Sequence, residues 1–347
     1  MLGPQGAAAA RRRIHRQHMH RKRKEGNGMT VSRVEYAGRQ AGVDTADDTP
    51  DLHCPACLEQ GKPLRMVVEG RYRLVRCREC RTEYFRADPA LAGCDGQAPV
   101  SEYWEQYKFG LYASDEVRRG YEQRYEATLD EAERLTGRIG TVLDVGCGIG
   151  NFVSFAQTRC DRAYGVDVDA GAVNMARSRG LRVALSDDLD ALLPDASMDA
   201  LTLWDVIEHL YDPFPVLNGA LRKLRPGGTV IFETPDASFP VRPVVLAVNA
   251  MSRGRVDLTG HMYYWEHKIY FTEAGMRAIL NRLECEVISV ERPTSPRAKM
   301  QEIFTRYADA SWQSRALAHA WPRLEGAARR VGRGNKLIVI AQYTGRG

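Results

Sequence analysis

Three glycines at alternating positions, Gly146, Gly148 and Gly150, constrain the fold more than any other feature of the sequence. They follow the apolar stretch TVLDV and precede an apolar-periodic segment that begins at Asn151 or Phe152. This order predicts a buried strand, a tight turn and a helix. Because glycine has no Cβ, such a turn lets the backbone lie against a ligand at the carboxyl end of the strand. We therefore expect an α/β domain with a nucleotide-type binding loop.

Acidic residues around this loop indicate which kind of nucleotide is bound. Asp167 ends the second expected strand, AYGVDVD, and lies 21 residues after Gly146. At that distance a carboxylate can accept both hydroxyl hydrogens of a ribose. A dinucleotide site would show the pattern G-x-G-x-x-G, whereas here position 151 is Asn151 and Asp144 stands two residues before the first glycine. The sequence thus predicts a ribose-bearing cofactor and disfavours NAD.

Four ordered blocks extend this pattern: VLDVGCGIG, GVDVD, SMDALTLWDVIEHLYDP and LRKLRPGGTVIFETPD. Together they resemble the class I S-adenosylmethionine-dependent methyltransferases over residues 139–292, with LIVIAQY at 337–343 as the last strand. The resemblance implies a doubly wound, seven-stranded, Rossmann-like α/β domain that holds S-adenosyl-L-methionine over the carboxyl ends of its strands. With its cysteine-rich segment, the chain is similar to bacterial methyltransferases that carry an N-terminal zinc ribbon and are related to the ubiquinone-type O-methyltransferases.

The resemblance also implies a set of cofactor-binding residues. The glycine loop would enclose the methionine part of the cofactor, Asp167 would hold the ribose, and Val168 would cover one face of the adenine. Residues after the third expected strand, LRVALS, would meet the adenine amine, with Asp187 as the alternative if the register shifts by one. The implied set is Asp144, Gly146, Gly148, Gly150, Asp167, Val168, Asp188, Leu189, Trp204 and Asp205.

Trp204 and Asp205 follow the fourth expected strand, DALTL. By resemblance they would flank the methyl-donating sulfur. Two alternatives stay open, because an aromatic residue at a strand end often only packs, and Asp205 could cap the helix expected over VIEHL.

Methyl transfer from a sulfonium has an excellent leaving group, so the protein must chiefly align the reactants and exclude water. An oxygen nucleophile must also lose a proton, usually to a histidine. By resemblance, Glu208 and His209 match the E-H pair of ubiquinone-type O-methyltransferases, and His267 lies near the substrate mouth in HMYYWEHKIYFT, a segment shared by His261. We expect Glu208, His209 and His267 to be catalytic. The alternatives are histidines that only form hydrogen bonds, or a divalent ion whose third ligand the sequence does not identify.

Four of the eight cysteines form two C-x-x-C pairs separated by nineteen residues, the spacing of a structural zinc site. Between the pairs, alternating apolar and charged residues predict a β-hairpin that turns at Glu69 and Gly70. We therefore expect a zinc ribbon over residues 51–88, with a redox pair as the alternative reading. The expected Zn²⁺ ligands are Cys54, Cys57, Cys77 and Cys80.

The net charge of +5 is concentrated in residues 1–28, which carry +7, so residues 29–347 carry −2. Such a body lacks the basic field expected of a nucleic-acid-binding protein. We expect residues 1–50 to be a disordered basic leader and linker, with a nucleic-acid or membrane-surface arm and a transit peptide as alternatives. Cysteine usage without a secretory signal predicts a cytoplasmic protein, and no apolar run is long enough for membrane insertion.

The remaining organisation follows from pattern and length. Residues 89–135 are expected to form a connecting helical segment whose aromatic side chains mostly pack against a neighbouring domain. Residues 136–347 are expected to form the methyltransferase domain, with insertions at 237–268 and 295–333. Long connections often form binding loops, so the first insertion is expected to build the acceptor pocket.

The expected function is in-line O-methylation of a small-molecule, glycan or secondary-metabolite acceptor. One alternative is a tRNA or rRNA methyltransferase that uses the arginine-rich ribbon and the basic arm, although no N/D-P-P-Y motif follows the fourth strand. Another is a non-catalytic regulator that binds the cofactor.

Overall fold

The computed structural model describes residues 52–68, 72–87, 110–112, 114–186, 189–253, 255–256, 258–263, 266–301 and 312–345. The chain divides into two units, Met1–Thr49 and Pro50–Gly347, and every described residue belongs to the second. The expected leader, the hairpin turn at Glu69 and Gly70, and the acids Asp187 and Asp188 lie outside the described residues.

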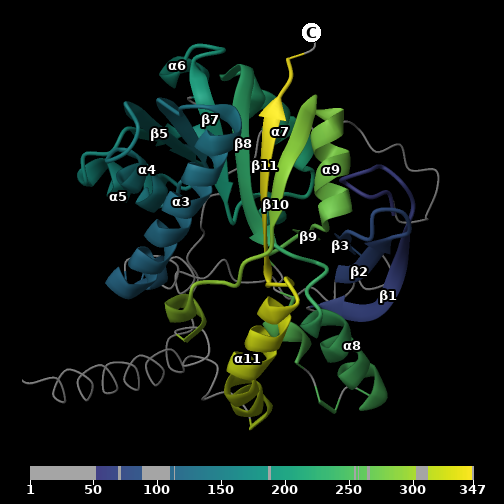
Figure 1. Cartoon of the computed structure of the whole chain (residues 1–347). Coiled ribbons are helices and arrows are strands. Elements are labelled where there is room, and N and C mark those ends of the chain that lie inside the picture. Colours follow the sequence, from purple (N-terminus) through teal and green to yellow (C-terminus); the bar gives the residue numbers. More distant parts are fainter. Residues whose placement is uncertain are drawn as a thin grey trace, which may run out of the picture. The chain divides into compact units, whose positions relative to one another are not determined.

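A seven-stranded sheet in the order β10-β11-β8-β7-β4-β5-β6 forms the centre of this unit (Figure 1). Strand β11 is antiparallel to both neighbours, and the other pairings are parallel. The order reverses at β4, and ligands of doubly wound sheets bind at such a switch point, beyond the carboxyl ends of the strands. The strands are β4 (Thr141–Val145), β5 (Arg162–Asp167), β6 (Val183–Leu185), β7 (Met198–Trp204), β8 (Leu224–Pro235), β10 (Cys285–Glu291) and β11 (Lys336–Tyr343).

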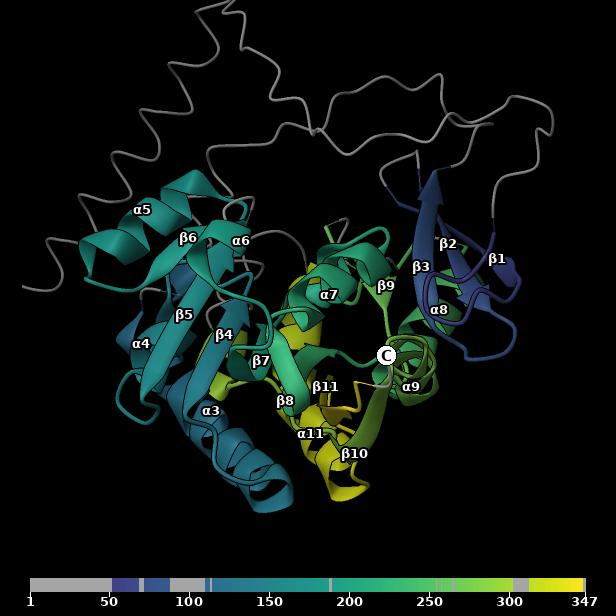
Figure 2. The ribbon, with the colours of Figure 1, turned by 90° about the horizontal axis from the view of Figure 1, so that it is seen from above.

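Helices cover both faces of this sheet, as the Rossmann-like prediction requires (Figure 2). Neighbouring strand residues point to opposite faces, so Val142 packs in the core beneath α3, α4 and α5, whereas Leu143 packs in the core beneath α7 and α9. The helices of the two layers are α3 (Asp115–Thr136), α4 (Asn151–Ala156), α5 (Ala170–Ser178), α6 (Leu189–Leu192), α7 (Pro213–Leu221) and α9 (Glu273–Arg282).

Local signals place these helices where the sequence predicts them. Helix α4 begins at Asn151, directly after the last glycine of the loop. The side chain of Thr272 accepts a hydrogen bond from the backbone nitrogen of Gly275 and so caps α9. Tyr121 and Tyr125 on α3 are buried, so these two aromatic residues of the connecting segment pack as predicted.

The cysteine-rich segment forms a second sheet in the order β1-β2-β3-β9. Its strands are β1 (Gly61–Val68), β2 (Tyr72–Cys77), β3 (Glu83–Ala87) and β9 (Ile269–Tyr270). The antiparallel β1–β2 pairing confirms the predicted hairpin. Strand β9 directly follows the first insertion and pairs Tyr270 with Glu83, a pairing that the sequence did not indicate. Figure 2 shows these strands beside α9, away from β5, β6 and α5.

Both insertions contain helices. The first insertion contains α8 (Val241–Met251) and the short helix η4 (Thr259–His261). Another short helix, η3 (Ile207–His209), precedes this insertion. The second carries a helical turn at 297–301 and α11 (Trp312–Arg330). Among the described helices, none is both long and apolar enough to span a bilayer.

Candidate functional site

The glycine loop leaves β4 at the switch point of the sheet and requires glycine at its first position. Gly146 has φ +76°, and a Cβ there would stand 2.6 Å from a methyl group of Val206. Its nitrogen donates to the carbonyl of Val166 at 2.7 Å, which fixes the turn against β5. Gly148 has φ +52°, and no atom lies within 4 Å of the position of its Cβ. The loop thus presents bare backbone to open space at the carboxyl edge of the sheet.

Asp167, at the end of β5, is held against this loop. Its carboxylate accepts hydrogen bonds from the backbone nitrogens of Gly148 at 2.7 Å and Asp169 at 2.9 Å. A carboxylate has about four lone-pair positions, so both oxygens keep capacity for further donors. The next side chain, Val168, is apolar yet 67% exposed. Leu189 begins α6 and is partly buried against the core, whereas Asp188 lies outside the described residues.

Asp144 lies in β4, beneath the loop, and is 3% exposed. Thr202 on the neighbouring strand β7 donates a hydrogen bond to its Oδ1 at 2.7 Å. Burial raises the pKa of Asp144 to about 8, despite this hydrogen bond. The carboxyl group is therefore largely protonated at neutral pH.

Trp204 ends β7 and packs in an aromatic cluster, as one of the two readings of the sequence predicts. Its ring centroid lies 4.7 Å from that of Tyr125 and 5.4 Å from that of Phe152. Its Nε1 is buried and has no hydrogen-bond acceptor among the described residues.

Asp205 does not cap a helix, so that alternative reading is wrong. Helix η3 begins after Val206 without a side-chain cap, and Asp205 has φ +55°. Its carboxylate instead pairs with Lys299 at 2.9 Å and with Lys336, and it accepts a hydrogen bond from Tyr121 at 3.1 Å. Burial alone would raise the pKa of Asp205, but the two lysines hold it well below its usual range.

These lysines belong to a buried charge cluster that the sequence reasoning missed. Lys336 also lies 3.7 Å from Glu233, and Arg124 of α3 pairs with Glu233 at 3.1 Å. Although burial opposes its charge, Asp205 helps to raise the pKa of Lys299 well above its usual value. The partners are separated by 94 to 131 residues in sequence, so no local motif could have identified them.

Glu208, His209 and His267 lie together near the carboxyl end of β7. Each offers one ligand or acceptor atom, and these atoms lie within 4.8 Å of one another. The rings of His209 and His267 meet edge to face with centroids 4.8 Å apart. The structure therefore brings together the three predicted catalytic residues, and His267 is the third side chain that a divalent ion at Glu208 and His209 would need.

Hydrogen bonding and burial both affect the ionisable groups of this cluster. Nδ1 of His209 lies 3.2 Å from the carbonyl oxygen of Glu266, which can only accept, so the neutral ring carries its hydrogen there and its Nε2 is an acceptor. Burial, with His209 nearby, lowers the pKa of His267 well below its usual value. Burial and the charge of Asp205 raise the pKa of Glu208 to about 8. The imidazole of His267 is therefore neutral at neutral pH and lies beside a largely protonated carboxyl group.

The four predicted cysteine ligands converge at the edge of the smaller sheet. Sγ distances are 3.6 Å for Cys54 and Cys80, 3.4 Å for Cys57 and Cys77, and 3.5 Å for Cys57 and Cys80. Sulfurs around a tetrahedral zinc, with Zn–S bonds of about 2.3 Å, stand ~3.8 Å apart, whereas a disulfide would need ~2.05 Å. A hydrogen bond from Cys54 lowers the pKa of Cys80 to about 5. The set fits a four-thiolate metal site.

Comparisons with known proteins agree on one kind of domain. The protein family described as "Methyltransferase domain" matches residues 117–290. The chain is 36% identical over 107 residues to a probable S-adenosylmethionine-dependent methyltransferase of Mycolicibacterium smegmatis, a match that covers 30% of this chain and 41% of that protein. It is 27% identical over 162 residues to the ubiquinone biosynthesis O-methyltransferase of Pseudomonas syringae pv. tomato, covering 43% of this chain and 68% of that protein. A solved structure of a SAM-dependent methyltransferase from Archaeoglobus fulgidus superposes with a TM-score of 0.41 at 18% identity, over 70% of this chain and all of that one.

Proposed function

The chain belongs to the class I S-adenosylmethionine-dependent methyltransferases, and on that basis we propose that it methylates an oxygen atom of a small-molecule or glycan acceptor. The name of the Pseudomonas syringae relative supports oxygen as the methylated atom. The observation that carries the proposal is the ring contact between His209 and His267, at the same edge of the sheet as the glycine loop.

The residues around the loop fit the cofactor. The open space at Gly148 accommodates a ligand against the backbone, and Asp167 keeps lone pairs for two ribose hydroxyls. The exposed side chain of Val168 offers an apolar surface for the adenine, and Nε1 of Trp204 offers an unused donor. We propose that the cofactor-binding residues are those expected from the sequence, including Asp144, Gly146, Gly150, Asp188, Leu189 and Asp205.

The bound cofactor would supply a methyl group carried on a sulfonium sulfur. Once the methyl group is transferred, that sulfur is left as a neutral thioether. The residues of this chain align the acceptor, exclude water and take up its proton. His267 is the proposed proton acceptor, because its ring lies in this histidine pair beside the carboxyl end of β7, and His209 and Glu208 position it. The four cysteines are proposed to hold a structural Zn²⁺, since four thiolates leave no open position for a reacting water.

A transfer assay with S-adenosyl-L-methionine carrying a tritiated methyl group, run against cell extracts, tests the function. We expect label in a small-molecule or glycan fraction whether or not ribonuclease is added. Label that disappears with ribonuclease would identify an RNA methyltransferase instead. Cofactor binding by calorimetry without label in any fraction would identify a non-catalytic regulator.

A further inference from the structure

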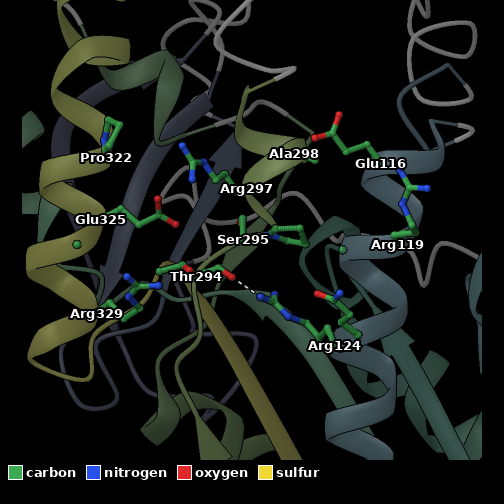
Figure 3. Close-up of a pocket in the computed structure, with 14 residues that line it drawn as sticks. Glu116, Arg119, Arg124, Thr294, Ser295, Arg297, Ala298, Pro322, Glu325 and Arg329 are labelled. Carbon is green, nitrogen blue, oxygen red and sulfur yellow. Dashed lines mark hydrogen bonds between the residues drawn. The ribbon is translucent and has the colours of Figure 1, made fainter.

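A polar cleft of about 740 Å³ separates α3 from α11 at the carboxyl edge of the sheet (Figure 3). One wall is a single face of α3, since its lining residues run from Glu116 to Arg124 with helical spacing. The opposite wall is the face of α11 that carries Pro322, Glu325, Gly326 and Arg329, and residues 294–298 form the floor. Two of its three walls therefore belong to the second insertion, whose role the sequence leaves open.

Three guanidinium groups line this cleft from three different elements. Arg119 comes from α3, Arg297 from the helical turn after residue 296, and Arg329 from α11. All three side chains are exposed, and within the described part of the chain none forms an ion pair. Figure 3 shows Glu325 and Arg329 directed across the cleft toward residues 294–298. Like charges gathered in one concave site favour an anion between them.

A fourth arginine connects the cleft to the candidate active site. Arg124 donates to the backbone carbonyl of Thr294 and pairs with Glu233 at 3.1 Å, so its charge is already balanced. Glu233 in turn neighbours Lys336, which pairs with Asp205 beside Trp204. The chain of charges from Arg124 through Glu233 and Lys336 to Asp205 thus links the cleft to the candidate active site.

The chemistry of the cleft favours a phosphate group. A phosphate monoester presents three terminal oxygens and about two negative charges, whereas a carboxylate presents two oxygens and one charge, so a phosphate satisfies more guanidinium donors. Glu116, Glu325 and Gln123 also line the cleft and can accept hydrogen bonds from hydroxyl groups. This combination suits a phosphorylated polyol better than a simple anion.

We propose that this cleft binds the phosphate group of the methyl acceptor, with Arg119, Arg297 and Arg329 as its ligands. The proposal rests on the proposed methyl transfer and adds the acceptor class, a hydroxyl-bearing phosphate monoester. It also gives the second insertion a function, because that insertion supplies two of the three arginines.

Binding of inorganic phosphate to the full chain tests the cleft directly and needs no methyl transfer. Calorimetry should detect phosphate binding, and the double variant Arg297→Gln/Arg329→Gln should weaken it about tenfold for each charge-assisted contact removed. Glu325→Gln should strengthen it, because it removes a negative charge from the wall. Arg330→Gln on the same helix is the control, since Arg330 does not line the cleft and binding should be unchanged. Absence of phosphate binding, or equal loss in the control variant, would overturn the site.

Treatment of the extract with alkaline phosphatase tests whether the phosphate belongs to the acceptor. Methyl label should fall at least tenfold after treatment, and the double variant should raise the acceptor KM while its cofactor affinity stays unchanged. Full labelling after treatment would show that the cleft holds a free phosphate instead, and would overturn the acceptor assignment. Failure of the proposed function has a different signature, because untreated extract would then give no label even though phosphate still binds.

Discussion

Tyr263 of the first insertion donates a hydrogen bond to Glu83 of β3 at 2.8 Å. Glu83 is almost fully buried and also accepts a two-nitrogen contact from Arg76. Strand β9 begins two residues after His267. Its second residue, Tyr270, pairs with Glu83, so β9 continues the same sheet. The cysteine-rich sheet therefore supports the segment that carries the proposed proton acceptor, while the glycine loop belongs to the other sheet.

Loss of the metal should therefore affect turnover more than cofactor binding. We expect purified protein to contain one Zn²⁺ in the cysteine site, and Cys80→Ser to lose it. The Tm should fall by roughly 10 °C or more, because structural zinc supplies on the order of 10 kcal/mol in small modules and 1 kcal/mol shifts Tm by ~2–4 °C at this size. Methyl transfer should fall at temperatures where calorimetry still detects cofactor binding. Cys160→Ser, outside the metal site, is the control and should match the wild type in both measurements.

His267→Ala should lower kcat by roughly 10²- to 10⁴-fold, the usual contribution of a general base. Cofactor affinity should be unchanged, because His267 lies in the first insertion rather than at the glycine loop. His319→Ala, an exposed histidine on α11, should retain full turnover. An unaltered kcat in His267→Ala would refute its role as the proton acceptor.

Metal content separates a proton acceptor from a metal ligand in the same variants. With His267 as a base, wild type and His267→Ala both hold a single metal ion per chain. A second ion in the wild type that His267→Ala loses would instead assign Glu208, His209 and His267 to a divalent metal site.

Gly146→Ala should weaken cofactor binding by roughly 5- to 150-fold, since strain of about 1–3 kcal/mol accompanies a side chain at such a φ. The added methyl would also press on Val206, and relief requires the loop to move. Calorimetric titration with S-adenosyl-L-methionine measures the loss. Gly219→Ala in α7 is the matched control, because no atom lies within 4 Å of its Cβ position, and it should bind normally.

Lys336→Met should destabilise the fold by roughly 3–5 kcal/mol, the cost of leaving a buried charge without its partner. The buried carboxylates of Asp205 and Glu233 would then both lose the ammonium group of Lys336, which pairs with each of them. Adding Asp205→Asn should recover much of the loss, and urea denaturation of the two single variants and the double variant measures the coupling. Additive effects would show that the pair does not act as a unit.

The sequence predicts the parts of this molecule whose signals are local. The strand, glycine loop and helix around Gly146 follow from residues within a dozen positions, and each C-x-x-C pair is a short turn. The buried cluster around Asp205 was not predictable in the same way. Lys299 and Lys336 approach it from 94 and 131 residues away, and each by itself reads as an ordinary surface lysine.

Pairing between distant strands is hidden for the same reason. Two residues directly after the first insertion, Ile269 and Tyr270, suffice to pair with β3, and so short a strand has no periodicity to detect. The contact between Tyr263 and Glu83 spans 180 residues. Only the folded chain shows that the ribbon and the candidate catalytic segment form one structure.

The pKa of Asp144 predicts how stability depends on pH in the absence of cofactor. The folded value, about 8, lies above the ordinary 3.8, because the carboxyl group is buried. The folded state therefore binds the proton more tightly than the unfolded state. The stabilisation that this proton gives the folded state is complete below pH ~4 and is lost as the pH rises through ~8.

Asp144→Asn keeps an oxygen that can accept the hydrogen bond from Thr202 but cannot ionise. We expect thermal melts to show its Tm exceeding that of the wild type by about 3 °C or more at pH 9, the shift that 1 kcal/mol produces in a domain of this size. Below pH ~4, where the unfolded carboxyl group is protonated as well, the difference should nearly vanish, and Asp161→Asn, which alters an exposed carboxylate, should show no such trend. A variant whose advantage is the same at both pH values would mean that the buried carboxyl group does not titrate in this range.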